Sequence, residues 1–422
     1  MMRAMAGHAI DGELRNPEKF VESVRSAAVG LQPYLRRTPC LHSHTFSDGD
    51  GCDVFLKLEN LQRTGSFKIR GAVHRVLGLT PEERRSGLVA ASAGNHAQGV
   101  ALAAKLMKAP ATIVMPESTP LIKIRRTEGY GAKVLLHGEN WDQAQARAMQ
   151  LAAAEGLAMV HPFDDPKVMV GQGTLALELL EDVPDLDMVL IPVGGGGLLA
   201  GMALVLRSLR PEVRIIGVQA EGADSMARSF RSGARVEIDN PRTLADGIRV
   251  GSPGKHTWEV IQHFVDDVIT VSEAEITQAL VETIERSKVV AEAAGVVGIA
   301  ALSSGKLKLK PDMRVCALVS GGNIDLNLLA RVIESGLAAS GFYDHLQLRL
   351  PDDPGHLAPL LEVVSKHKGN VLDVQHYRAG WKVPVGWVDV EILIETRNPG
   401  AGEVIARELA GAGYQVTRTL SD

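Results

Sequence analysis

Strand-like and helix-like segments alternate along most of this chain, and that alternation limits the possible folds more than any other feature. Apolar, strand-like segments end in turn residues at 53–60, 87–92, 111–116, 132–138, 188–195, 214–221 and 315–322. Helical segments lie between them, such as Asn95 to Lys105 and Trp141 to Glu155. This alternation favours parallel sheets covered by helices on both faces. We therefore expect an α/β fold from about residue 50 to about residue 335.

The sequence changes character after residue 335. Residues 336–342 are mostly small, which is typical of a linker. Residues 343–422 then read as strand, helix, strand, strand, helix and strand, the order of a ferredoxin-like α+β unit. We therefore divide the chain into a region 1–335, a linker 336–342 and a C-terminal domain 343–422.

Charge and cysteine usage argue against several classes of protein. The 422 residues carry a formal net charge of -5, which gives no chain-wide basic field for nucleic acid or an anionic membrane. The first residues lack the apolar block of a secretory signal. Cys40, Cys52 and Cys316 form neither a C-x-x-C pair nor an even disulfide framework. These observations fit a cytoplasmic protein with small-molecule partners best.

A lysine in the stretch RTGSFKIRGA is the first candidate for chemistry. Lys68 follows Gly65, Ser66 and Phe67 where a loop is expected to turn into a helix. A lysine amine can form a Schiff base, and burial beside apolar groups lowers its pKa. Taken alone, however, a lysine is more often an ordinary solvated side chain.

Four successive glycines form the second candidate site. Gly194, Gly195, Gly196 and Gly197 follow a predicted strand and precede an apolar helix that starts near Leu198. Backbone N–H groups at such a helix N-terminus can converge on a phosphate. The run matches neither an ATP-binding P-loop nor the G-x-G-x-x-G dinucleotide pattern. A tightly packed turn without a ligand is the alternative interpretation.

Two further motifs place polar side chains after predicted strands. SAGN, residues Ser92, Ala93, Gly94 and Asn95, follows one strand, and SGGN, which begins at Ser320, follows another. Open α/β sheets bind ligands at the carboxyl ends of their strands. Each motif alone is also consistent with an ordinary helix N-cap.

Taken together, SFK, SAGNH, GGGGL and SGGN resemble, in this order, the tryptophan-synthase-like or fold type II group of pyridoxal-phosphate enzymes. Within that group the sequence is most similar to threonine ammonia-lyase, also called threonine dehydratase. The resemblance covers residues 20 to 335. It implies two open parallel-sheet domains, the smaller one at about 60–155 inserted in the larger one.

The resemblance also implies roles for individual residues. Lys68 would carry pyridoxal 5'-phosphate, and Phe67 would lie beside the cofactor. Asn95 would donate a hydrogen bond to the phenolic oxygen, and Ser320 would sit at the pyridine nitrogen. The cofactor phosphate would bind to the backbone N–H groups of Gly194, Gly195, Gly196, Gly197 and Leu198. The substrate carboxylate would bind to Ser92, Ala93, Gly94 and Asn95.

These roles predict elimination of ammonia from a β-hydroxy amino acid, with Lys68 as the base. Threonine would give 2-oxobutanoate, as isoleucine biosynthesis requires, and serine would give pyruvate. Serine racemases share the scaffold but usually carry a second acid or base, a serine, where this chain has Ala93. Alanine cannot transfer a proton, so a lyase is favoured. A serine racemase, a hydroxyaspartate ammonia-lyase and a non-catalytic amino-acid sensor remain the alternatives.

The C-terminal segment resembles an ACT domain, a regulatory module that often binds amino acids between paired subunits. By this likeness Asp353, Pro354, Gly355 and His356 would form an effector site at the first strand-to-helix turn. Allosteric control by an amino acid such as isoleucine would follow, in a homodimer or homotetramer. The alternative is a ferredoxin-like unit used only for subunit contacts.

No metal site is expected. In some relatives a cation binds beside a strand whose motif begins Glu-Pro, whereas this chain has Gln219 at that point. The change puts a cation site near Ala223 and Asp224 in doubt. The histidines show no H-x-x-x-H spacing, and His96 is more typical of the start of a helix than of a metal ligand.

Overall fold

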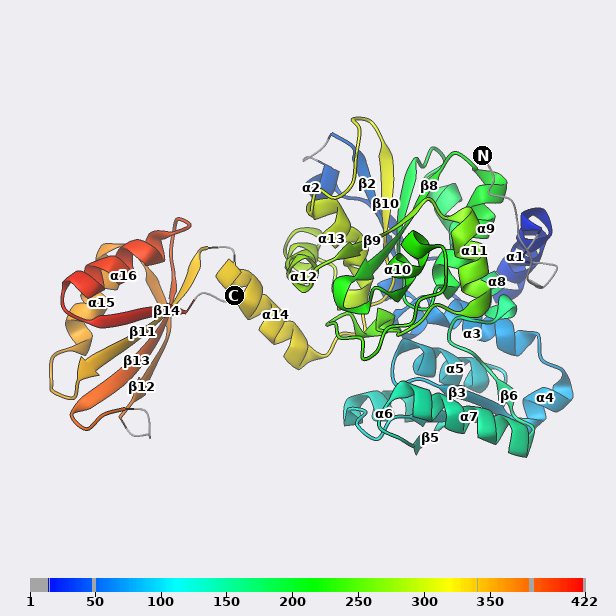
Figure 1. Cartoon of the computed structure of the whole chain (residues 1–422), viewed down its shortest axis with the longest axis horizontal. Helices are drawn as coiled ribbons and strands as arrows, with labels where there is room; N and C mark the ends of the chain where they lie inside the picture. The colour runs from blue at the N-terminus through cyan, green and yellow to red at the C-terminus, as the bar shows by residue number, and fades with distance from the viewer. Residues whose placement is uncertain (1–13, 15, 48–50, 340, 379–382, 420–422) are drawn as a thin grey trace. The chain divides into compact units, whose positions relative to one another are not determined.

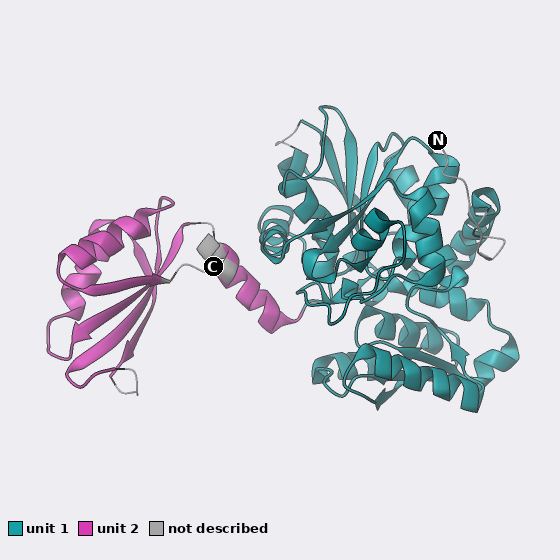
Figure 2. Cartoon of the chain, in the orientation of Figure 1, with its two compact units in different colours: residues 1–324 teal, residues 325–422 magenta. Residues whose placement is uncertain are grey.

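The chain divides into two compact units, residues 1–324 and 325–422 (Figure 2). The computed structural model describes residues 14, 16–47, 51–339, 341–378 and 383–419. The predicted linker 336–342 is wrong in its first part, because Leu326–Ala339 forms one continuous helix, α14, that belongs to the second unit. The alanines and leucines of this segment favour a helix by more than the single interior glycine, Gly336, opposes it.

The larger sheet of the first unit is mostly parallel, as predicted. Its strand order is β1-β2-β10-β7-β8-β9, and only β1 pairs antiparallel. The strands are β1 (Cys40–His42), β2 (Asp53–Leu58), β7 (Met188–Pro192), β8 (Arg214–Ala220), β9 (Asp267–Val271) and β10 (Arg314–Val319). All five residues of β7 are buried. A central strand buried on both faces explains why its sequence is continuously apolar rather than alternating.

Helices cover both faces of this sheet. Figure 1 shows α12 (Glu273–Ser287) and α13 (Val297–Ser303) on one side, and α8 (Pro166–Asp182) and α9 (Gly197–Leu209) on the other. The other helices of this part are α1 (Pro17–Leu31), α2 (His44–Ser47), α10 (Ser225–Ser232) and α11 (Lys255–Phe264). Ten consecutive residues of α9, 197–206, are buried. The long apolar sequence of this helix is therefore that of a helix packed inside the protein. Among the described residues, no helix is long and apolar enough to cross a membrane.

The smaller sheet is inserted between β2 and β7. It is parallel throughout, with the order β5-β4-β3-β6. Its strands are β3 (Leu88–Ala91), β4 (Ala111–Met115), β5 (Lys133–Leu136) and β6 (Ala158–Met159), and the nearby helices are α3 (Lys68–Leu77), α4 (Pro81–Ser86), α5 (Asn95–Leu106), α6 (Leu121–Glu128) and α7 (Trp141–Glu155). The inserted part therefore continues to Met159, beyond the expected limit near residue 155.

The second unit follows the predicted β-α-β-β-α-β order after α14. Its elements are β11 (Tyr343–Pro351), α15 (Leu357–Lys366), β12 (Asn370–Tyr377), β13 (Trp387–Glu395), α16 (Ala401–Gly411) and β14 (Gln415–Thr419). The sheet is antiparallel in the order β12-β13-β11-β14. Alternate residues of β13, from Val388 to Ile394, are buried against the helices, which is the pattern of a sheet with one covered face.

Candidate active site

One pocket in the first unit brings the separate sequence motifs together. Its volume is ≈ 1090 Å³, and it opens where strands of both parallel sheets end. The predicted catalytic, cofactor and substrate residues all line it: Phe67, Lys68, Ser92, Ala93, Gly94, Asn95, Gly194, Gly195, Gly196, Gly197, Leu198 and Ser320. The carboxyl end of a parallel sheet is the expected place for a ligand in an α/β fold.

Lys68 is the first residue of α3, and its side chain is partly buried in the pocket. Its Nζ donates a hydrogen bond to the Pro162 carbonyl at 2.9 Å and lies 5.2 Å from the centroid of the Phe67 ring. Burial lowers the pKa of Lys68 to about 8, although the negative charge of Glu292 acts in the opposite direction. A substantial fraction of this amine is therefore neutral near pH 8, as a nucleophile or base requires.

The loop that carries Lys68 is fixed to the SGGN loop. The Phe67 N–H donates to the Ser320 carbonyl at 3.1 Å, and the Gly322 N–H donates to the Gly65 carbonyl at 2.9 Å. These bonds hold together two segments that are far apart in sequence. Among the described residues, the Ser320 hydroxyl makes only one long contact, of 3.5 Å to the Ala294 carbonyl, so it can still bond to a ligand.

The four glycines connect β7 to α9 and allow a close approach of backbone segments. Gly196 has φ +101°, and a Cβ on Gly197 would lie 2.8 Å from the Phe163 Cα. The Gly195 carbonyl accepts hydrogen bonds from the Gly254 N–H at 3.1 Å and the Thr257 Oγ1 at 2.6 Å. The start of α11 therefore holds the glycine loop in place, while the start of α9 presents N–H groups that the helix itself leaves unpaired.

Asn95, at the start of α5, belongs to a side-chain network that the sequence did not reveal. Its Nδ2 donates to Glu292 Oε1 at 2.7 Å, and its Oδ1 accepts from Asn323 Nδ2 at 2.6 Å. The Asn323 N–H also donates to Glu292 Oε2 at 3.2 Å. Burial, together with the negative charge of Asp246, raises the pKa of Glu292 to about 7. Asn323 was visible in the SGGN motif, but nothing in the sequence marked the lone Glu292.

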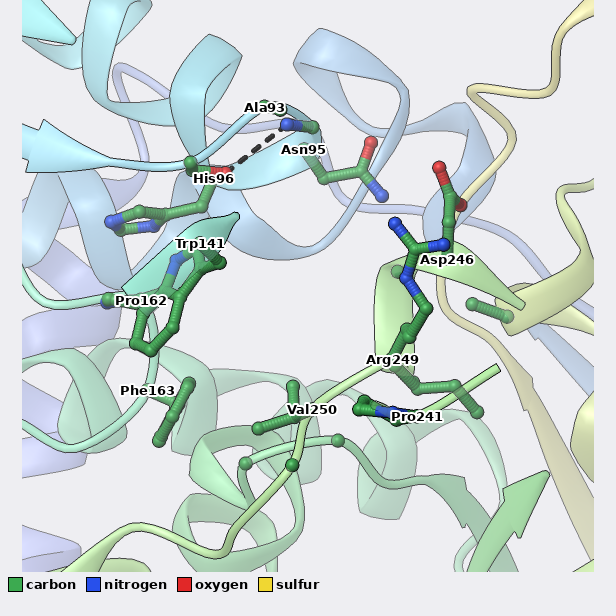
Figure 3. A pocket seen from close by; sticks show the side chains of 18 of the residues that line it. Ala93, Asn95, His96, Trp141, Pro162, Phe163, Pro241, Asp246, Arg249 and Val250 are labelled. Carbon is green, nitrogen blue, oxygen red and sulfur yellow. Dashed lines mark hydrogen bonds between the residues drawn. The ribbon is translucent and has the colours of Figure 1, made fainter. Parts of the chain in front are cut away.

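Aromatic and charged side chains complete the pocket wall, and they too were not anticipated. Figure 3 shows Trp141, Phe163, Asp246 and Arg249 around it. The Trp141 and Phe163 rings stack with centroids 6.5 Å apart. Trp141 could be read from the sequence only as the start of a helix, because its position in the pocket depends on the tertiary packing of α7.

His96 does not contribute a titrating group. Its Nε2 contacts the Val160 carbonyl at 2.8 Å, and its side chain is buried. Burial is the main cause that lowers the pKa of His96 to about 3, so the ring is neutral at physiological pH. A structural role at the start of α5 follows.

The residues considered for an effector or a cation lie elsewhere. Asp353, Pro354, Gly355 and His356 form the turn between β11 and α15 in the second unit, where Gly355 has φ +102°. Gln219 Oε1 accepts from the Ala227 N–H at 2.9 Å, and Asp224 pairs with Arg228 at 2.7 Å; Ala223 lies in the short 3-10 helix η3 (Glu221–Ala223). Within the described residues no cluster of His, Cys, Asp and Glu side chains could hold a metal ion.

Comparison with known proteins identifies the chemistry of this pocket. The sequence profile of the pyridoxal-phosphate dependent enzyme family matches residues 31–321. This chain belongs to that family. It is 45% identical to the L-threonine ammonia-lyase of Thermotoga maritima over 94% of this chain and 98% of that protein.

Solved structures agree with the family assignment. The processed form of threonine deaminase isoform 2 from Solanum lycopersicum is 35% identical and has a TM-score of 0.71, with 79% of this chain and 90% of that chain covered. The maize serine racemase is 35% identical and has a TM-score of 0.71, with 76% of this chain and 98% of that chain covered. Both lyases and racemases therefore share this scaffold, so the fold alone does not select between the two reactions.

The pocket fits pyridoxal phosphate, the cofactor of this family. A lysine of lowered pKa, Lys68, faces the same space as a helix N-terminus suited to a phosphate. The glycine loop fits this interpretation, because a Cβ at Gly195 would lie 2.4 Å from the Phe163 ring that lines the pocket. Bound there, the cofactor supplies an aldehyde for amines and a conjugated ring that withdraws electrons.

Proposed function

We propose that this enzyme removes ammonia from L-threonine to give 2-oxobutanoate, and from L-serine to give pyruvate. The observation that carries the proposal is the pairing of Lys68 and the glycine loop in one pocket of a chain 45% identical to an L-threonine ammonia-lyase. The reaction needs an amine that binds the aldehyde of the cofactor and a helix N-terminus that binds its phosphate. The protein must hold these two groups at a fixed separation.

In this proposal each predicted residue keeps its role. Lys68 carries the cofactor, with Phe67 beside it, and Ser320 lies at the pyridine nitrogen. Gly194, Gly195, Gly196, Gly197 and Leu198 bind the phosphate. Ser92, Ala93, Gly94 and Asn95 hold the substrate carboxylate, and Asn95 also donates to the phenolic oxygen of the cofactor.

Proton transfer then centres on Lys68. Its neutral Nζ removes the proton from the substrate Cα, and the lowered pKa keeps much of this amine unprotonated near pH 8. The β-hydroxyl leaves as water with one added proton, which is balanced overall by the proton removed from Cα. A second water molecule then hydrolyses the C=N bond. The net products are therefore a 2-oxo acid and ammonia.

Ala93 favours elimination over racemisation. Inversion at Cα requires a proton donor on the face opposite the base, and alanine offers none. Ala93 lines the pocket in the loop between β3 and α5, where serine racemases usually place their second acid or base. We therefore rank the lyase above a serine racemase on the same scaffold.

Steady-state release of 2-oxo acid from threonine, serine and 3-hydroxyaspartate tests the proposal. Lys68→Ala should abolish the visible absorbance of the bound cofactor and lower turnover by about 10²- to 10⁴-fold, the usual contribution of a general base. Lys105→Ala is a suitable control, since this side chain is exposed at the end of α5. A colourless wild-type protein would favour a non-catalytic amino-acid sensor, and release from 3-hydroxyaspartate alone would favour a hydroxyaspartate ammonia-lyase.

For the second unit we propose an ACT-like regulatory role. The turn at Asp353, Pro354, Gly355 and His356 would bind an amino-acid effector in a cytoplasmic homodimer or homotetramer, for control of isoleucine biosynthesis. The residues 352–355 are exposed, and the glycine lets the backbone approach a ligand. Titration of isoleucine and valine against activity tests this role. If neither amino acid changes the activity, the second unit serves only for contacts between subunits.

A further inference from the structure

A buried carboxylate that the proposed reaction does not use lies at one end of the pocket. Glu292 is 5% exposed and immediately precedes the 3-10 helix η5 (Ala293–Gly295). A Cβ on Gly321 would lie 2.3 Å from Glu292 Oε1, and a Cβ on Gly247 would lie 3.2 Å from it. The backbone is fixed as well, because the Glu292 N–H donates to the Gly321 carbonyl at 3.0 Å. The carboxylate therefore occupies a slot that glycines leave open for it.

The slot aims both carboxylate oxygens at groups that surround Asn95. Oε1 accepts from Asn95 Nδ2 at 2.7 Å, and Oε2 accepts from the Asn323 N–H at 3.2 Å. Asn323 Nδ2 in turn donates to Asn95 Oδ1 at 2.6 Å and to the Thr64 carbonyl at 2.6 Å. Burying a charged group costs free energy unless hydrogen bonds compensate for it. A fully bonded network of this kind holds its side chains in one arrangement.

This arrangement selects one of two orientations of the Asn95 amide. An ionised carboxylate only accepts hydrogen bonds, whereas the Asn323 amide nitrogen only donates them. The Asn95 amide nitrogen must therefore point to Glu292 and its oxygen to Asn323. A flipped amide would place two acceptors together at one end and two donors at the other. Within the part of the chain that the structure describes, Asn95 Nδ2 donates only to Glu292, so its second hydrogen can point to a ligand in the pocket.

We propose that Glu292 is a positioning residue: it fixes the Asn95 amide so that its free N–H donates to the phenolic oxygen of the cofactor. This inference rests on the cofactor placement in the proposed function. Glu292 acts through Asn95, and it adds to the binding of cofactor without itself taking part in proton transfer.

Charged groups from several elements bear on the ionisation of Glu292. Asp246, in the 3-10 helix η4 (Asp246–Ile248), raises its pKa, and Lys123 of α6 lowers it. Glu292 in turn raises the pKa of Lys68 at the start of α3. With a pKa of about 7, the carboxyl group is ionised above that pH and selects the Asn95 orientation there. Below it, the neutral acid can donate as well as accept, and the selection weakens.

The decisive experiment is Glu292→Gln, measured as cofactor binding rather than activity. The cofactor is removed from the purified full-length protein, and pyridoxal phosphate is titrated back at pH values from 6 to 9. The wild type should show a step in affinity and in cofactor absorbance near pH 7. The variant should bind about 10-fold more weakly or worse at pH 8, as expected when a hydrogen bond to a charged group is lost. It should also lack the step near pH 7, while the titration of Lys68, whose pKa is about 8, should remain.

Controls separate positioning from general damage. Glu285→Gln changes an exposed carboxylate on α12 and should leave both readouts unchanged. Should Glu292→Gln not fold, Asn323→Ala removes the other partner of Asn95 and should weaken binding in the same direction. Binding within about 2-fold of wild type, with the step near pH 7 retained, would overturn the proposal.

The outcome is also distinguishable from a failure of the proposed function. A wild type that binds the cofactor through Lys68 but releases no 2-oxo acid from any hydroxy amino acid would refute the reaction. The cofactor titration of Glu292→Gln would still decide the role of Glu292. Conversely, an active enzyme with unchanged cofactor binding in that variant would refute only the positioning role.

Discussion

The two ends of the pocket are held in place by different kinds of contact. At the glycine end, from Gly194 to Gly197, main chain packs directly against main chain. A Cβ on Gly197 would lie only 2.8 Å from the Phe163 Cα. At the other end, geometry comes from side-chain hydrogen bonds among Asn95, Glu292 and Asn323. Main-chain groups do not titrate in the physiological range, whereas a buried carboxyl group can.

The difference suggests a division of labour within one pocket. A phosphate is anionic at neutral pH and is served by backbone N–H groups whose donor character does not change. The phenolic oxygen needs a donor in one orientation, and an asparagine amide has that orientation only if its neighbours impose it. We therefore expect variants at the glycine end to weaken binding equally above about pH 7, where a phosphate ester keeps its second negative charge. Variants at the Glu292 end should change the pH dependence.

The largest effect should come from Gly197→Ala. The added methyl group would meet the Cα and carbonyl oxygen of Phe163 at 2.8 Å, and neither atom can move without shifting the backbone. Overpacking of this kind costs about 1–3 kcal/mol, which corresponds to about 5- to 150-fold weaker cofactor binding if all of it is lost from the bound state. Titration of pyridoxal phosphate should give the same ratio of affinities to wild type at pH 7.5 and at pH 9, where the charge of the phosphate does not change.

A matched control for this variant lies in α1. A Cβ on Gly30 would have no atom within 4 Å, so Gly30→Ala should leave cofactor binding unchanged. Strong pH dependence of the Gly197→Ala defect would contradict the comparison, because it would place a titrating group at the glycine end.

The glycine end was predictable from sequence, and the Glu292 end was not. Four successive glycines between a strand and a helix form a local signal in the sequence, and the structure places all four in the wall of the pocket, between β7 and α9. The bond between Asn95 and Glu292 joins residues 197 positions apart. No composition or spacing rule marks a single glutamate as buried, and only tertiary packing brings it to Asn95.

The same reasoning explains which parts of the fold were foreseen. Strands buried on both faces, such as β7 and β3, were visible because this burial requires continuous apolar sequence. The five-residue strand β9 was missed, because it is only partly buried and its sequence is not continuously apolar. The strands β1 and β6 span only three and two residues, too few to produce a pattern. The boundary near residue 336 was misplaced because small residues such as alanine favour both linkers and helices.

A smaller effect should come from Asp164→Ala, which loosens the support of the glycine loop. Asp164 accepts hydrogen bonds from the Lys255, His256 and Thr257 N–H groups at 2.9, 2.8 and 3.2 Å, and so caps α11. Loss of a cap costs about 1 kcal/mol of unfolding free energy. Urea unfolding should show this loss, and Asp164→Asn, which keeps one acceptor oxygen, should lose less. Equal stability of the alanine variant and wild type would mean that the cap contributes nothing.

The smallest effects should come from two variants that shift, in opposite directions, the pH at which the ionisation of Glu292 changes the cofactor absorbance. Asp246 and Lys123 pair at 2.5 Å, with side-chain exposures of 45% and 25%. Asp246→Asn removes a negative charge that raises the pKa of Glu292, so the step in cofactor absorbance should move to lower pH. Lys123→Gln removes a positive charge that lowers it, so the step should move to higher pH.

Each of these shifts should stay below about one pH unit, because both side chains are partly exposed to screening solvent. Added salt should therefore shrink both shifts toward the wild-type value, while the defect of Gly197→Ala stays unchanged. Shifts of the same sign in the two variants would mean that breaking the ion pair moves the surrounding loop. The pH step would then report loop position rather than the charge on Glu292, and the contrast between the two ends of the pocket would lose its electrostatic basis.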